Sequence, residues 1–337
     1  MPTVAQIISA VRDFAPQSLQ ESWDNSGLQT GDPAAECTGA LVCVDVTEAV
    51  LAEAVDRGCN LVLSHHPMLF RGVKTITPST PTGRMLMYAI QHGIAVYSAH
   101  TSLDSTIGGI SYAMAAHLGV NVTRVLSPAE HYMSSLHLHF HADRAMDARM
   151  VLEDAGFTPV ENRDDIIVNI RTDRVGEVMD TLAASRAGAP VSYSLTPLEF
   201  PEPRHGLGVY GILEPPLTIA QLAQKCREVF GTPCIRAAGI DAFDRDTPIR
   251  RVAMCGGAGA EFARTARALG AQVYITGDVK YHELAEADLN PGMAIMDIGH
   301  YESESCAKEI FIDVISEKFR NFVVLKSTTD ANPVKYI

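Results

Sequence analysis

Apolar runs of strand length alternate with helically spaced segments along the first 118 residues. The runs lie at residues 40–45, 60–63 and 94–98, and apolar residues recur at helical spacing in residues 4–14, 47–57, 83–92 and 110–118. Period-2 or continuous apolar runs predict strands, and a 3.6-residue period predicts helices. Strands that alternate with helices pair in parallel through right-handed crossovers. This part of the chain therefore predicts an α/β fold.

The pattern changes near Pro128. Expected elements then follow the order strand, helix, strand, strand, helix, strand, at residues 136–140, 145–155, 158–160, 166–170, 175–184 and 191–195. This order is ferredoxin-like. A proline-rich stretch at residues 196–203 indicates the exit of an inserted domain, and α/β strands resume at residues 251–255, 273–276 and 294–297, before a closing helix at 301–319. We predict a split α/β domain (residues 1–130 and 246–337) with an inserted ferredoxin-like α+β domain (residues 131–245).

Composition narrows the possible partners and the compartment. The 337 residues carry a net charge of −13, which argues against a nucleic-acid partner because such proteins need a basic stripe. No apolar run approaches the roughly 18 residues of a membrane span, and the N-terminus lacks the pattern of a signal peptide. The seven cysteines are scattered without a C-x-x-C pair, which argues against structural zinc and a disulfide framework. We expect a cytoplasmic protein.

The dipeptide His65-His66 is the first candidate functional feature. It follows the apolar run 60–63 and precedes Pro67. Proline lacks a backbone donor and ends regular strand pairing, so the two imidazoles are expected at a strand end, where α/β proteins place their sites. Successive strand residues point to opposite faces. Each ring is therefore expected to reach a different ion.

Further histidines and carboxylates follow the other expected strands: His100 and Asp104, Asp278 and His282, and His300 and Glu304. The last two pairs have the four-residue spacing that places side chains on one helical face. Imidazole and carboxylate together suit first-row transition metals. Three histidines and two carboxylates exceed the ligands of one catalytic zinc and suit two ions bridged by a carboxylate, for which Glu304 is the candidate.

Each residue also has a structural interpretation. A single histidine of this kind is more often structural than metal-binding. Asp104 also fits a helix N-cap or a turn, and Glu304 fits a solvated position early in a helix. The joint placement after separate strands favours the metal site. Gly256, Gly257 and Gly259, between a strand and a helix, fit either a phosphate cradle or a tight turn with close packing.

Five segments carry a resemblance to a known family: 23–29 (Trp-Asp-Asn-Ser-Gly-Leu-Gln), 64–67 (Ser-His-His-Pro), 100–104 (His-Thr-Ser-Leu-Asp), 276–278 (Thr-Gly-Asp) and 299–304 (Gly-His-Tyr-Glu-Ser-Glu). Together they resemble the NIF-three-like family, whose bacterial members are often labelled GTP cyclohydrolase 1 type 2 homologues. The resemblance implies two divalent metal ions per chain, such as zinc, iron, manganese or nickel, and a ring-shaped homohexamer. The metal ligands that it implies are His65, His66, Asp104, His300 and Glu304, with Glu304 touching both ions.

The family label implies a hydrolase of nucleotide-like or heterocyclic substrates. Its reaction would open the imidazole ring of GTP, with hydroxide attack at C8 and release of formate. His100, or His282 beside Asp278, would then act as general base or acid, and the glycine turn would hold phosphate. A second hypothesis is a non-catalytic metal-binding scaffold for metal delivery or protein interaction. It needs the same ligands but no substrate pocket.

Overall fold

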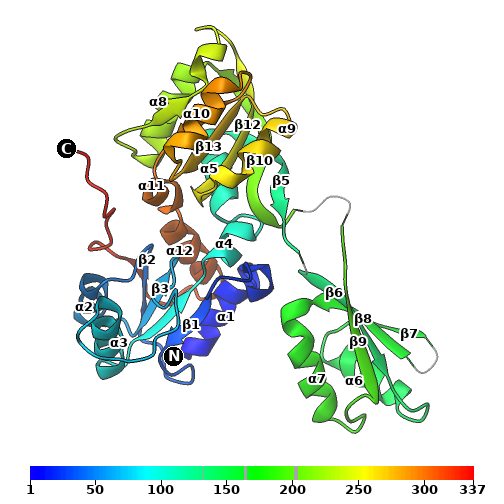
Figure 1. The fold of residues 1–337 in the computed structure, drawn as a ribbon. Coiled ribbons are helices and arrows are strands. Elements are labelled where there is room, and N and C mark those ends of the chain that lie inside the picture. The colour runs from blue at the N-terminus through cyan, green and yellow to red at the C-terminus, as the bar shows by residue number, and fades with distance from the viewer. Residues whose placement is uncertain (131, 163–164, 201–203) are drawn as a thin grey trace. The chain divides into compact units, whose positions relative to one another are not determined.

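The computed structural model describes residues 1–130, 132–162, 165–200 and 204–337. The chain divides into two compact units, one formed by Met1–Pro128 with Arg204–Ile337 and the other by Ala129–Pro203 (Figure 1). The first unit contains parallel strands linked by helices, and the second is an α+β unit inserted in the chain. The predicted fold class is therefore confirmed.

The first sheet of the α/β unit has the order β1 (Gly27–Thr30), β4 (Ala95–Ser98), β3 (Leu61–Ser64), β2 (Ala40–Cys43), β15 (Val324–Lys326). All pairs are parallel except β1 with β4. The residues of β2 alternate between two cores, Leu41 and Cys43 facing one and Ala40 and Val42 the other. Helices cover both faces: α2 (Glu48–Asp56) and α3 (Pro81–Gln91) on one, α1 (Val4–Phe14) and α12 (Ala307–Lys318) on the other (Figure 1). Burial on both faces explains why these strands are continuous apolar runs.

The second sheet has the order β11 (Arg236–Ala238), β14 (Ala294–Asp297), β13 (Val273–Gly277), β12 (Ile249–Ala258), β10 (Gly206–Leu217), β5 (Val120–Pro128). Its parallel centre is β12, β13 and β14. Helices α5 (Ile110–Leu118) and α8 (Ile219–Phe230) pack on one face, and α9 (Ala263–Ala268) and α10 (Tyr281–Leu289) on the other. The core under α5 is continuous with the core under α1, so one apolar cluster joins the two sheets.

The predicted end of the insert needs correction. The strands of the α/β unit form two sheets, a division that periodicity does not predict because it identifies strands but not their partners. The compact inserted unit ends at Pro203, whereas the sequence interpretation extended the insert to residue 245. Strand β10, absent from the predicted elements, pairs with β5 and β12, and α8 buries Leu222 and Cys226 in the α/β core. Of the proline-rich stretch predicted as the exit, residues 201–203 lie outside the described part.

The inserted unit has the predicted ferredoxin-like order. Its elements are β6 (Met133–His139), α6 (Ala145–Asp154), β7 (Pro159–Asn162), β8 (Asp165–Arg171), α7 (Val175–Ala183) and β9 (Ser192–Pro197). The strands form an antiparallel sheet in the order β7-β8-β6-β9. Leu136 and Leu138 of β6 pack with Val178 and Leu182 of α7, so the inserted unit has a separate apolar core.

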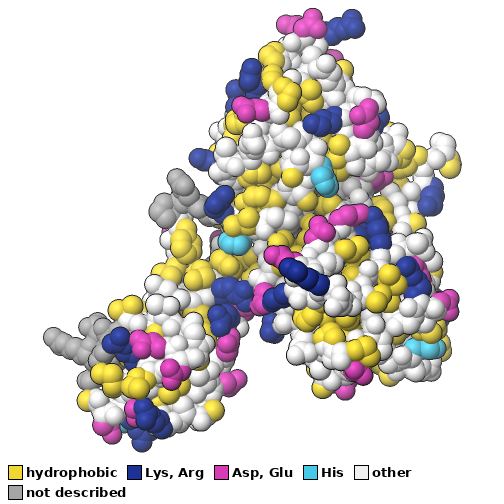
Figure 2. Space-filling model, turned by 180° about the vertical axis from the view of Figure 1, so that it is seen from behind, with side chains coloured by type: hydrophobic (Ala, Val, Ile, Leu, Met, Phe, Trp, Pro, Cys, Tyr) yellow, Lys and Arg dark blue, Asp and Glu magenta, His cyan; other side chains and the backbone are white. Residues whose placement is uncertain are grey.

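Short helices complete the chain. They are α4 (Thr101–Ser105), α11 (His300–Glu304) and the 3₁₀ turns Gln17–Leu19, Thr172–Arg174, Ile240–Ala242 and Ala260–Phe262. The predicted closing helix is thus divided into α11 and α12. No helix in the described ranges is long and apolar enough to cross a membrane. On the face drawn in Figure 2, acidic and basic side chains are interspersed.

Candidate metal centre

Four imidazoles gather where β3, β4 and β14 end. His65 and His66 directly follow β3, His100 precedes α4 after β4, and His300 opens α11 after β14. The ring centroids of His65 and His66 each lie 5.4 Å from that of His100, and those of His66 and His300 are 5.3 Å apart. Two carboxylates, Asp104 of α4 and Glu304 of α11, come from the same short helices. The carboxyl ends of the parallel strands therefore bring together residues from both sheets.

Glu304 lies at the centre of the cluster and is 2% exposed. Its two carboxylate oxygens face different imidazoles. Oε1 is 3.5 Å from Nε2 of His65, whereas Oε2 is 2.9 Å from Nε2 of His66 and 3.1 Å from Nε2 of His300. Asp104 completes the first side, with Oδ1 3.6 Å from Nε2 of His65. The carboxylate of Glu304 thus lies between His65 with Asp104 on one side and His66 with His300 on the other.

The protein does not fully satisfy the buried polar atoms at this centre. Within the described ranges, Nε2 of His65 and Oδ1 of Asp104 are buried without a hydrogen bond, and Oε2 of Glu304 faces the Nε2 atoms of His66 and His300, which carry lone pairs when the rings are neutral. Such atoms lose their hydration without compensation and destabilise the fold by roughly 1–3 kcal/mol each. All three are electron-pair donors, so a cation fits them. Each of three groups could hold a metal ion: His65 with Asp104 and Glu304, His66 with His300 and Glu304, and His65 with His66 and His100.

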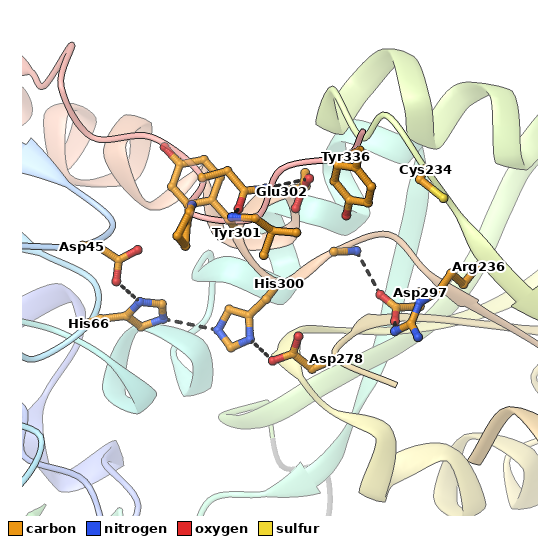
Figure 3. Close-up of a pocket in the computed structure, with 14 residues that line it drawn as sticks. Asp45, His66, Cys234, Arg236, Asp278, Asp297, His300, Tyr301, Glu302 and Tyr336 are labelled. Carbon is orange, nitrogen blue, oxygen red and sulfur yellow. Dashed lines mark hydrogen bonds and ion pairs between the residues drawn. The ribbon is translucent and has the colours of Figure 1, made fainter. Parts of the chain in front are cut away.

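The Nδ1 atom of each imidazole, on the side away from the centre, donates a hydrogen bond to an oxygen atom. The acceptors are Ala99 O for His65 (3.0 Å), Asp45 Oδ1 for His66 (2.8 Å), Asp24 Oδ1 for His100 (2.8 Å) and Asp278 Oδ2 for His300 (2.8 Å). Figure 3 shows Asp45 joined to His66 and Asp278 joined to His300 by such bonds, with the two rings facing each other through their Nε2 atoms. Carbonyl and carboxylate oxygens only accept, so Nδ1 carries the hydrogen and the Nε2 lone pair points into the centre. This is the usual arrangement behind metal-binding histidines.

Asp24 and Asp45 are positioning residues that sequence reasoning did not single out. Asp24 also accepts hydrogen bonds from the amide and hydroxyl of Thr101 and from Ser26, at 3.1, 2.6 and 2.7 Å. Burial raises the pKa of Asp24, but these bonds and the His100 bond outweigh it and hold that pKa well below its usual range. The position of Asp45 shortly after β2 could have marked it as a candidate site residue, because His65 and His66 follow β3 in the same way.

The pKa shifts at the centre favour positive charge on the rings and negative charge on Glu304. Burial lowers the pKa of His66 and of His300, but hydrogen bonds to Asp45, Asp278 and Glu304 outweigh it and raise them to about 10 and about 9. Burial raises the pKa of Glu304, but His65 and the other rings hold it well below its usual range. Burial raises the pKa of Asp104. Protons on the rings thus supply the charge that a metal ion would supply.

Two pockets open onto the cluster from different sides. One, of about 420 Å³, is lined by Trp23, Phe70, His100, Glu261 and other residues, together with His66, His300 and Glu304. The other, of about 450 Å³, is drawn in Figure 3 and also reaches His66 and His300. A small molecule entering either pocket can therefore approach the candidate ligands.

Comparison with known proteins identifies the family. The model of the Duf34/NIF3 (NGG1p interacting factor 3) family matches residues 2–333. The chain belongs to the Duf34/NIF3 family. The curated "GTP cyclohydrolase 1 type 2 homolog" of Bacillus subtilis (strain 168) is 26% identical over 370 residues, with 98% of each chain covered. Its namesake from Halalkalibacterium halodurans is 29% identical over 374 residues, again with 98% of each covered. The crystal structure of a Bacillus cereus protein related to NIF3 aligns with a TM-score of 0.76 at 26% identity and covers 100% of this chain and 99% of that one.

One residue of the predicted constellation belongs to none of the candidate metal-binding groups of this NIF3-family chain. His282 is exposed on α10, where its ring contacts Tyr281, and it belongs to none of the metal-binding groups. The prediction paired it with Asp278 on one helical face. Helix α10 begins only at Tyr281, and Asp278 lies before it at a positive φ of 53°, so the helical spacing does not apply. Asp278 instead supports His300.

The glycine run offers no free donors to a phosphate. The amides of Gly256, Gly257 and Gly259 donate to Ser111 Oγ, Ser303 Oγ and Thr276 Oγ1, at 3.3, 2.9 and 3.0 Å. The structure supports the alternative interpretation of close packing. Gly257 has a φ of +62°, and a Cβ there would overlap Oε1 of Glu304. The missing side chain at Gly257 is what allows Glu304 to reach its position.

Proposed function

We propose that this NIF3-family chain is a dinuclear-metal hydrolase acting on a nucleotide-like or heterocyclic substrate. The supporting observation is the carboxylate of Glu304, whose oxygens face His65 on one side and His66 with His300 on the other. Asp104 adds a second carboxylate on the His65 side. Each adjacent histidine would then serve a different ion, with Glu304 shared between the two. Zinc, iron, manganese and nickel all accept such ligands.

A bound pair of divalent cations would supply a water molecule activated near neutral pH and a Lewis acid for the substrate. The protein's own residues provide the rest. Ala99, Asp45 and Asp278 fix the tautomer and orientation of the ligand histidines. The low exposure of Glu304 keeps bulk water away from its carboxylate and strengthens the local electrostatic interactions.

His100 is the proposed proton carrier. Its ring lines the pocket of about 420 Å³, and its Nδ1 donates to Asp24. Because Nδ1 donates to Asp24, Nε2 carries the lone pair of the neutral ring, and His100 can accept a proton there and later return it. Asp24 acts here as a positioning residue, because it touches His100 rather than the pocket.

The proposed substrate class is suggested by the name of the curated relatives, which points to GTP. For this chain the reaction would be hydrolytic opening of a guanine imidazole ring with release of formate. The proposal includes the homohexamer that the family resemblance implies and the cytoplasmic location expected from the scattered cysteines. Sedimentation analysis of the full chain would measure the first, and cell fractionation the second.

The deciding experiment uses full-length protein purified without chelator. Metal content is measured first, and we expect close to two ions per chain. The protein is then incubated with GTP and with a panel of nucleosides and cyclic amides, while formate is assayed. Glu304→Gln should lose metal and activity together, whereas Glu317→Gln, an exposed control, should change neither. Retention of both metals with no formate from GTP would reject the GTP reaction. No hydrolysis of any compound would leave the metal-binding scaffold as the function.

A further inference from the structure

Two exposed aromatic side chains form one wall of the pocket beside the candidate metal centre. Trp23 is 58% exposed and Phe70 is 49% exposed. Their ring centroids are 6.0 Å apart, and each ring lies edge-on to His100, at 5.8 and 6.3 Å. Large aromatic rings left in solvent together, next to candidate catalytic groups, point to a ligand that covers them.

Apart from its histidines, the charged side chains that line the same pocket are acidic among its described residues. It contains Asp45, Asp104, Glu261 and Glu304 and neither Lys nor Arg. Asp45, Asp104 and Glu304 each face a histidine. Glu261 makes no hydrogen bond or ion pair within the described part of the chain. Its carboxylate is therefore available to accept hydrogen bonds from a ligand.

We propose that this pocket is a base-recognition subsite, in which a guanine ring packs against Trp23 and Phe70, whose planes are inclined by 55°, and hydrogen-bonds to Glu261. Aromatic faces bind planar rings by stacking, and a carboxylate accepts two parallel N–H bonds. Guanine offers such a pair on one edge, from N1–H and the 2-amino group. Adenine does not. The idea that the bound guanine lies where it can react rests on the proposed function. The binding of guanine to the subsite does not.

The absence of basic side chains from the described lining gives the proposal a second part. Phosphate groups are normally recognised by Arg, Lys or free backbone amides, and the amides of the adjacent glycine run are already used. Without bound metal, the subsite thus recognises the base and the nucleoside, and the phosphates of GTP add little to its affinity. Guanosine is the simplest ligand that tests this.

Trp23 is the only tryptophan of the chain, so its fluorescence reports on this pocket alone. The full-length protein is titrated with guanosine, GTP and adenosine in its metal-loaded form and again after chelator treatment, which removes metal capture of phosphate from the GTP comparison, and calorimetry checks each affinity. We expect saturable quenching by guanosine, a GTP affinity within about tenfold of it, and adenosine binding weaker by about tenfold. After chelator treatment, a GTP affinity more than about 100-fold above that of guanosine would overturn the phosphate-independent part.

Variants assign the roles of the individual residues. Phe70→Ala, which keeps the reporter, should weaken guanosine binding by roughly 5- to 100-fold through lost stacking. Glu261→Gln should weaken guanosine but not adenosine. Tyr281→Ala removes an aromatic ring that is 77% exposed outside this pocket and should change nothing. Metal content is measured for every variant, so that a loss of ions is not mistaken for a loss of stacking.

The outcomes separate this inference from the proposed function. Guanosine binding sensitive to Phe70 and Glu261, without formate release, would uphold the subsite and reject the hydrolase. Formate release with guanosine affinity unchanged in Phe70→Ala and Glu261→Gln would reject the subsite and uphold the hydrolase. No guanosine binding by either method, with both metals retained, would reject the subsite outright.

Discussion

His66 and His300 lie 234 residues apart in the sequence, and their Nε2 atoms lie 3.4 Å apart in the structure. Each ring donates its Nδ1 hydrogen to an aspartate, Asp45 or Asp278, so both facing nitrogens carry lone pairs when the rings are neutral. Two lone pairs at this distance repel each other unless a positive charge lies near them. A metal ion or a proton on one ring meets that requirement, and Glu304 beside them adds negative charge.

Replacing one histidine of the pair at the end of β3 should remove one ion. His65→Ala and His66→Ala are each expected to lower metal content towards one ion per chain, because each ring faces a different group of ligands. Elemental analysis of the purified variants measures this. His117→Ala, at an exposed position on α5, is the control. If either variant kept both ions at full occupancy, the division between His65 and His66 would be wrong.

The metal-free protein should lose stability as the pH rises. The folded-state pKa values of His66 and His300 are raised from 6.5 to about 10 and about 9. Their protonation therefore stabilises the fold fully below pH 6.5, and this contribution is lost as the pH rises through 9 and 10. The raised pKa of Asp104 acts in the same direction.

Thermal midpoints of chelator-treated and metal-loaded protein between neutral and alkaline pH measure this effect. The metal-loaded form should not follow the same decline, because bound ions replace the protons on the rings. Parallel pH profiles of the two forms would contradict the assignment of these rings as metal ligands.

Removing the support behind His300 should weaken metal binding without unfolding the chain. Asp278→Ala leaves Nδ1 of His300 without its acceptor, and loss of such support typically lowers metal affinity about 10- to 100-fold. Competition with a chromophoric chelator measures the affinity. Asp288→Ala, an exposed aspartate of α10, is the matched control. Equal affinities of the two variants would show that Asp278 does not position His300.

A side chain at Gly257 should displace Glu304. In Gly257→Ala the Cβ overlaps Oε1 of Glu304, and the residue is also strained by its φ of +62°. Gly270→Ala carries similar backbone strain, with a φ of +80°, but its Cβ would meet only Nε of Arg251, at an ordinary contact distance of 3.7 Å. Both variants should lose about 1–2 kcal/mol of folding free energy from strain. Only Gly257→Ala should also lose metal, and metal retention by Gly257→Ala would show that Glu304 is not a required ligand.

The proton-carrier role of His100 predicts a loss of rate with metal retained. His100→Ala is expected to lower kcat by roughly 10²- to 10⁴-fold, the usual contribution of a positioned acid or base. Asp24→Asn should give a smaller loss, because the ring remains but loses its anionic partner. Initial rates and metal content measured together check both. A loss of one ion in His100→Ala would instead identify His100 as a third imidazole ligand, as its grouping with His65 and His66 permits.

Local elements were largely predictable from the sequence because their signals are local. Continuous apolar runs identified β2, β3, β4, β13 and β14, since strands buried on both faces need apolar residues at every position. The order of elements in the insert predicted its ferredoxin-like fold. Strand β10 escaped prediction, although its pairing with β5 and β12 places residues 204–217 in the α/β unit. Strand pairing is a long-range property that no local window contains.

For the candidate site, the sequence by itself determined the residue types and their places after strands: His65 and His66 after β3, and His300 with Glu304 after β14. Only the tertiary structure decided which of these meet. It directs Asp278 to His300, leaves His282 in solvent, and uses Gly257 to admit Glu304 rather than a phosphate. The reason is physical: strand ends fix where a residue leaves its sheet, but helix starts, backbone dihedral angles and packing of the two sheets fix which atoms approach within bonding distance.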